Sequence, residues 1–104
     1  MKLIINAGIC GFNTEVNVSS EDMQNAIIEI KTECPSLKPL EKEIKEVDGF
    51  TECFGKVGDT EIYKIIRNHC PHAACPVASG IIKAIEVSCG LALPHDVEMK
   101  FISE

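Results

Sequence analysis

The chain has 104 residues, a length that predicts a single domain over residues 1–104. Hydrophobic residues make up 45% of it and charged residues 25%, as in an ordinary soluble globular protein. The net charge is -6, and no block of five like charges occurs, which argues against nucleic acid or an anionic membrane as the main partner.

The amino-terminal sequence MKLIINAGICGF lacks the apolar segment and cleavage pattern of a secretory signal. No apolar run approaches the ~18 residues that would span a bilayer. We therefore expect a cytoplasmic protein, in which cysteines normally stay reduced. The chain has six cysteines, and in a reducing compartment some of them are expected to serve metal or redox chemistry rather than disulfides.

The first predicted element is a short strand over Lys2–Asn6, where the sequence KLIIN is β-branched. A tight loop follows, because Gly8 and Gly11 flank Cys10 and glycines permit unusual backbone angles. The loop therefore presents Cys10 just beyond the end of the first strand.

Two further strands are predicted by alternating apolar residues. Glu15–Ser19 places Val16 and Val18 on one face, and Ala26–Thr32 continues with isoleucines at the same spacing. Asp22–Lys31 also matches helical spacing, but its β-branched residues favour a strand.

The middle of the chain is expected to be helical. Ser36–Val47 carries apolar residues at helical spacing, and Asp48-Gly49 is expected to end the helix. Phe50–Gly58, which holds Cys53, is predicted to be an irregular connector.

Two more helices and a strand are predicted in the last half of the chain. One helix begins at Asp59 or Thr60 and runs to about His69, and the next begins at Pro76 and ends near Cys89 or Gly90. A final strand is predicted where apolar residues alternate, at Val97, Met99 and Phe101. The order βββαααβ predicts an α+β domain, with an antiparallel sheet of about four strands and helices packed on one face.

Four cysteines are expected to lie in loops or at the ends of elements: Cys10, Cys34, Cys70 and Cys75. Three of them precede a proline, as cluster and metal ligands often do. The spacing Cys70-x4-Cys75 also occurs in plant-type ferredoxins, but the longer pattern of those proteins is absent here. Cys75 directly precedes a predicted helix, whose N-terminus would stabilise a thiolate.

These four cysteines predict a site that binds an iron–sulfur cluster or zinc, with His72 able to replace one thiolate. The paired knuckles of most structural zinc sites are absent, which fits a cluster somewhat better. The same cysteines also fit inert thiols at turns or a redox-active dithiol.

The other two cysteines are expected to differ from this set. Cys89 continues the apolar stripe of Ile82 and Ile85, so we expect a buried hydrophobic side chain. Cys53 lies beside Phe54 and remains open as a further ligand.

The segments NAGICGF (6–12) and CPHAACPVASGIIKAIEVSCGLALPHDV (70–97) resemble a small uncharacterised cysteine-rich family of methanogenic archaea and anaerobic bacteria, a domain of unknown function. The resemblance covers the full length and implies an anaerobic cytoplasmic setting, but it implies no reaction or substrate. It also implies that Cys10, Cys34 and Cys75 are the characteristic positions. Three thiolates can hold a 4Fe–4S cluster or zinc with one open position.

The sequence therefore predicts a small cytoplasmic metal- or iron–sulfur-binding protein that works with a protein partner. One alternative is a thiol enzyme, in which Cys75 is a nucleophile, His72 a base and Cys70 a resolving thiol. Another alternative is an adaptor domain that binds a protein partner without any chemistry.

Overall fold

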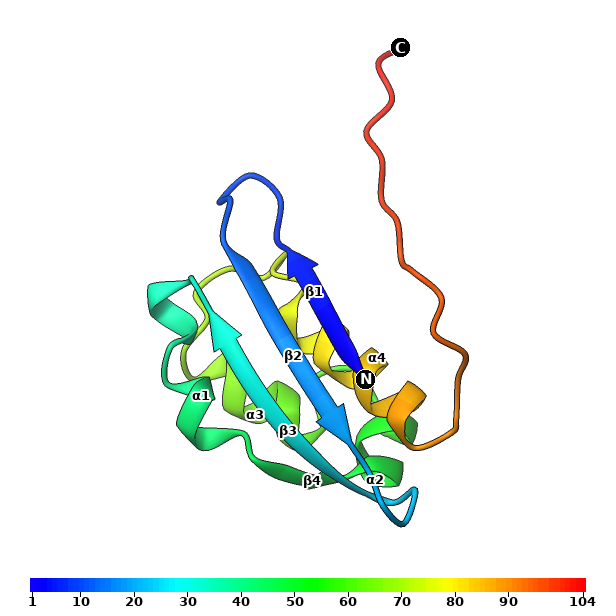
Figure 1. Ribbon diagram of the computed structural model, residues 1–104. Coiled ribbons are helices and arrows are strands. Elements are labelled where there is room, and N and C mark those ends of the chain that lie inside the picture. The colour runs from blue at the N-terminus through cyan, green and yellow to red at the C-terminus, as the bar shows by residue number, and fades with distance from the viewer.

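The computed structural model describes residues 1–104 and contains one four-stranded antiparallel sheet (Figure 1). The strands lie in the order β1-β2-β3-β4, so β1 and β4 are the two edges. Their bounds are Lys2–Asn6 for β1, Asn13–Ser19 for β2, Asn25–Thr32 for β3 and Glu46–Asp48 for β4.

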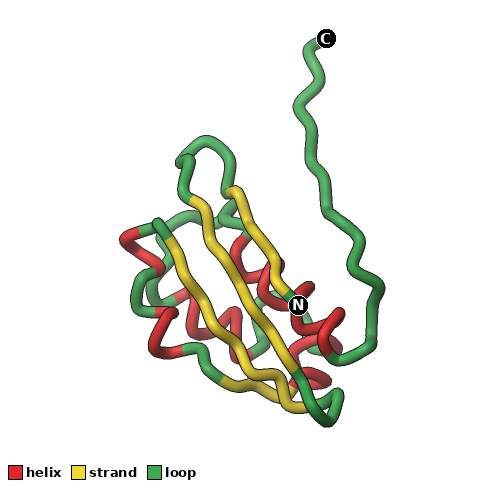
Figure 2. The backbone as a smooth tube through the Cα atoms, in the orientation of Figure 1, coloured by secondary structure: helices red, strands yellow, loops and turns green.

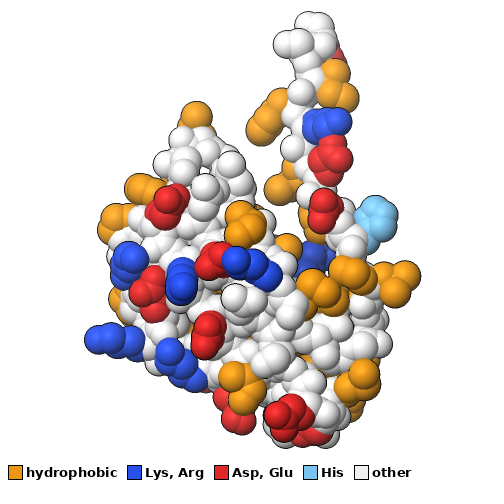
Figure 3. Space-filling view, in the orientation of Figure 1, with side chains coloured by type: hydrophobic (Ala, Val, Ile, Leu, Met, Phe, Trp, Pro, Cys, Tyr) orange, Lys and Arg blue, Asp and Glu red, His pale blue; other side chains and the backbone are white.

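The sheet has a buried face and a solvent-exposed face because its residues alternate. In β3 every second side chain, from Ala26 to Thr32, is buried, and the residues between them are exposed. The helices cover the buried face only (Figure 2), and the opposite face carries many charged side chains (Figure 3). One face of the sheet therefore builds the core.

The helical layer contains a short 3-10 helix and four α-helices. Their bounds are Pro35–Leu37 for η1, Leu40–Glu43 for α1, Gly49–Phe54 for α2, Glu61–Arg67 for α3 and Val77–Ser88 for α4. The longest helix, α4, packs against β1 and β2, and Gly80 lets it approach Ile5 so closely that an added Cβ would lie 2.5 Å from the Ile5 side chain. None of these helices has both the length and the apolar character that crossing a membrane requires.

The predicted α+β class with a four-stranded antiparallel sheet is confirmed, and so are the first three strands and the two helices that follow residue 59. The prediction of one helix over Ser36–Val47 is wrong. Pro39 lacks an N–H, and the segment divides into η1, α1 and the edge strand β4. Its apolar residues Leu37, Leu40 and Ile44 are nevertheless buried.

The connector predicted over Phe50–Gly58 also differs from the structure, because its first half forms α2. The carboxylate of Asp48 accepts the N–H groups of Phe50 and Thr51 and so caps this helix. Asp48-Gly49 begins a helix here instead of ending one.

The strand predicted around Val97–Phe101 does not join the sheet, whose fourth strand is β4. Residues 91–104, which we call the C-terminal arm, leave the end of α4 and extend away from the body (Figure 1). All residues of the arm are exposed.

Candidate thiol site

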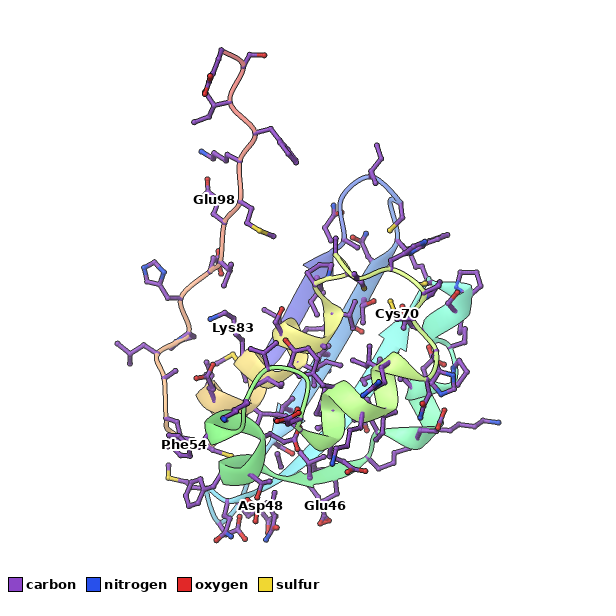
Figure 4. All side chains as sticks on the ribbon, turned by 180° about the vertical axis from the view of Figure 1, so that it is seen from behind. Glu46, Asp48, Phe54, Cys70, Lys83 and Glu98 are labelled. Atoms are coloured by element: carbon purple, nitrogen blue, oxygen red, sulfur yellow. The ribbon has the colours of Figure 1, made fainter.

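Three segments that are distant in sequence meet at one end of the sheet: the β1–β2 loop, the chain after β3 and the α3–α4 loop. They enclose a cavity of about 540 Å³, and ten of its fifteen lining residues are hydrophobic. Five of the lining residues are the predicted ligands: Cys10, Cys34, Cys70, Cys75 and His72. Figure 4 shows Cys70 at this end of the molecule, opposite Asp48 and Phe54.

Cys34 is positioned by the end of β3. Its N–H donates to Oγ1 of Thr32, the last residue of the strand, at 3.2 Å. Pro35 then begins η1, so the backbone on both sides of the half-buried Cys34 is constrained.

Cys70 and Cys75 are held by the turn that joins α3 to α4. The N–H of Cys70 donates to the carbonyl of Ile66 at 2.8 Å, which continues the helical pattern past the end of α3. The carbonyl of His72 accepts the Cys70 thiol at 3.5 Å and the Cys75 N–H at 3.2 Å. Both thiols are half-buried, and the Cys70 thiol lies near enough to raise the pKa of Cys75.

Cys10 lies at the tip of the β1–β2 loop and is exposed. Gly8 and Gly11 both have positive φ, and the N–H of Gly11 donates to the carbonyl of Gly8 at 2.9 Å. This glycine-bounded turn places Cys10 on the wall of the cavity.

The environment of Cys75 favours the neutral thiol. Burial raises the pKa of Cys75, and the neighbouring thiols of Cys70 and Cys34 raise it further. The N–H of Val77, at the start of α4, acts in the opposite direction with a smaller effect than burial. The predicted helix-terminus effect is therefore present, but burial outweighs it.

The remaining cysteines lie outside this cavity. Cys89 is buried in the core, as predicted, with its thiol 3.9 Å from the carbonyl of Gln24. Cys53 lines a different pocket beside Lys83 and Glu86, and burial is the main cause that raises its pKa to about 12. Cys53 does not join the thiol cavity.

Of the three histidines, only His72 lines the thiol cavity. His72 is exposed and lines the cavity, whereas Nε2 of His69 lies 2.6 Å from Oε2 of Glu43. His95 is exposed in the C-terminal arm.

A shared cavity is not the same as a formed coordination sphere. No group of three or more His, Cys, Asp or Glu side chains in the structure is arranged so that it could hold a metal ion. The potential metal ligands are nevertheless rich in sulfur, because four cysteines line the same cavity. The residues present therefore match zinc or an iron–sulfur cluster in type, although the side-chain geometry is not preformed.

Several residues that build the site belong to no sequence motif and were not predicted. Thr14 and Thr32 face each other across β2 and β3, and their buried hydroxyl oxygens lie 2.8 Å apart. Phe12 and Leu37 supply apolar wall. The one signal in the sequence is that both threonines occupy inward positions at the strand ends, where an apolar residue is usual.

Comparison with known proteins places the chain in a family without assigning a function. A family model described as "Family of unknown function (DUF6951)" matches residues 1–101. The chain belongs to this family. Searches of curated proteins and of solved structures found no match.

Proposed function

We propose that this protein binds a metal ion or an iron–sulfur cluster through Cys34, Cys70 and Cys75, with Cys10 or His72 in the fourth position. The observation that carries the proposal is the convergence of these residues on one cavity. They come from three separate segments, so the fold itself brings them to the same end of the sheet.

The chemistry of the cavity supports a soft metal centre. Thiolate sulfur is the usual ligand of iron–sulfur clusters and a common ligand of zinc, and a cluster would supply one-electron transfer. The largely apolar walls would exclude water from the bound group, and hydrogen bonds and solvent exclusion tune the potential of such centres.

Binding requires two changes that the local structure permits. The thiols must lose their protons, and their side chains must rotate toward one point. Pro35 and Pro76 hold the backbone beside Cys34 and Cys75, so rotation about the side-chain bonds is the main adjustment there. Cys10 would approach through the glycine-bounded loop, which leaves it exposed.

The proposed setting is an anaerobic cytoplasm with a protein partner. It is supported by the resemblance to a family of methanogenic archaea and anaerobic bacteria and by six cysteines that are all free thiols. The acidic net charge of -6 suits a protein partner better than nucleic acid.

A second candidate function is favoured by one observation. Because Cys70 and Cys75 line the same cavity and the Cys70 thiol is near enough to raise the pKa of Cys75, the two could form a reversible disulfide, with two protons and two electrons passing to a disulfide of a partner. The raised pKa of Cys75 does not favour this chemistry, because a reactive thiol usually has a lowered pKa.

Serine variants test the proposal. Protein purified without oxygen is analysed for zinc, iron and acid-labile sulfide in the variants Cys34→Ser, Cys70→Ser and Cys75→Ser. Each variant should lose most of its metal, whereas Cys53→Ser, whose side chain lies in another pocket, should retain it. Equal metal content in all four variants would contradict the assignment. Metal-free wild-type protein that reversibly forms a Cys70–Cys75 disulfide would favour the redox candidate.

A further inference from the structure

The C-terminal arm exposes several large apolar side chains that nothing in the chain covers. Large apolar side chains at Leu93, Val97, Met99 and Phe101 are exposed, and Phe101 is fully exposed. Figure 3 shows hydrophobic side chains on the arm standing clear of the body. Exposed apolar side chains grouped on one segment are typical of a surface that a partner covers.

The arm has the side-chain pattern of a half-buried strand. Val97, Met99 and Phe101 alternate with Asp96, Glu98 and Lys100, so that one face is apolar and the other is charged. Nζ of Lys100 lies 2.7 Å from Oε1 of Glu98, which confirms that these two side chains share a face. β3 has the same division into an apolar and a polar face.

The sheet offers an open edge at β1. Met1 exchanges both backbone hydrogen bonds with Val18, and the N–H of Ala7 donates to the carbonyl of Phe12. Because hydrogen-bonding direction alternates along an antiparallel strand, the backbone groups of Lys2, Ile4 and Asn6 point away from β2. These N–H and C=O groups are a template for a further strand.

We propose that the C-terminal arm of one chain adds as a strand to the β1 edge of a second copy, and that the exchange is reciprocal. The apolar side chains of the arm would continue the buried face beside Leu3, which is only half-buried at this edge. The charged side chains would join the solvent-exposed face beside Lys2.

Exchange with a second copy fits the course of the arm better than docking within the chain. After α4 the N–H of His95 donates to the carbonyl of Leu93 at 2.8 Å, and the arm then runs clear of its own β1 (Figure 1). In a two-fold dimer the arm of each protomer would pair with the β1 edge of the other, so that both arms and both edges are covered.

The exchange would join two segments of each protomer to its partner. Each protomer would contribute the alternating part of its arm and its own edge strand, so that two new strand pairs form in one dimer. The family model extends to residue 101, so most of the arm belongs to the domain shared by the family.

Light scattering of the full chain at high micromolar concentration tests the exchange. Wild-type protein is expected to have the mass of a dimer. Met99→Glu/Phe101→Glu should weaken dimerisation by about tenfold or more, since it places charge on the apolar face. Lys100→Glu changes the formal charge by the same amount on the charged face and should leave the dimer intact.

A second variant and a second measurement address the edge itself. Ile4→Pro removes an N–H that points away from β2, so it should abolish the dimer while β1–β2 pairing remains. Hydrogen exchange should show protection of the amides of residues 97–101 in the dimer and its loss on dilution. A monomer at every concentration, with or without protected arm amides, would overturn the proposal, as would a dimer that both variants leave unchanged.

Discussion

The hydroxyl oxygens of Thr14 and Thr32 lie 2.8 Å apart, buried between β2 and β3 at the end of the sheet that carries the thiol cavity. Oγ1 of Thr32 also accepts the N–H of Cys34. This pair therefore links the register of two strands to the position of a candidate ligand.

Replacing Thr32 with valine should both destabilise the protein and disturb the site. Thr32→Val leaves the Thr14 hydroxyl and the Cys34 N–H without a partner, which should lower the free energy of unfolding by about 1–3 kcal/mol. Urea denaturation measures the loss. The double variant with Thr14→Val removes one of the two unpaired groups and should recover part of it; a double variant with strictly additive losses would contradict this role.

Glu52 is a buried carboxylate that caps α3. Its two oxygens accept the N–H groups of Glu61 at 3.0 Å and Ile62 at 2.9 Å, and only 3% of the residue is exposed. Glu52→Gln keeps the size of the side chain but turns one acceptor into a donor, so we expect a loss of about 1–3 kcal/mol in unfolding free energy. The control Glu29→Gln, on the exposed face of the sheet, should change the urea midpoint very little. Equal effects of the two variants would contradict the capping role.

Gly49 is required by close packing at the start of α2. A Cβ at this position would lie 2.5 Å from Sγ of Cys89 and 2.9 Å from the carbonyl oxygen of Gln24. Gly49→Ala should therefore lower the thermal unfolding midpoint, at a cost of about 1–3 kcal/mol. Adding Cys89→Ala removes one of the two contacts and should restore part of the stability, and the absence of any recovery would show that the backbone contact dominates.

Acid should weaken the hairpin between β2 and β3. The N–H groups of Gln24 and Asn25 donate to Asp22 and lower its pKa from 3.8 to about 2, and the side-chain amide of Gln24 lowers the pKa of Asp48. Because both folded-state pKa values are depressed, the stability that each carboxylate contributes is complete above the ordinary value of 3.8. It is lost as the pH falls through the depressed pKa, which is about 2 for Asp22.

The urea midpoint measured through this pH range checks the expectation. The wild-type protein should lose stability on acidification. Asp22→Asn lacks the titrating group and should show a smaller decrease. An identical pH profile in both proteins would show that Asp22 does not contribute.

The elements that the sequence predicted well have strong local patterns. Apolar residues alternate in Ala26–Thr32 and recur at helical spacing in α4. In both elements these residues form the buried face, as the patterns predict. Cys10, Cys34, Cys70 and Cys75 could be grouped from sequence because each was expected in a loop or at the end of an element.

The features that were not predicted depend on contacts between distant segments. Glu46–Asp48 forms a strand because the edge of β3 is available, and Val97–Phe101 has the pattern of a strand but pairs with neither edge of its own sheet. The buried hydroxyl pair under the thiol cavity arises from the β2–β3 register, which single-strand patterns do not reveal.

Metal and acid-labile sulfide analysis of wild-type protein purified without oxygen shows whether the thiol cavity holds a metal ion or a cluster. We expect zinc in a stoichiometric amount, or iron with matching sulfide, either on purification or after anaerobic reconstitution. A folded protein that carries neither and takes up neither would contradict the assignment of the thiol cavity as a metal-binding site.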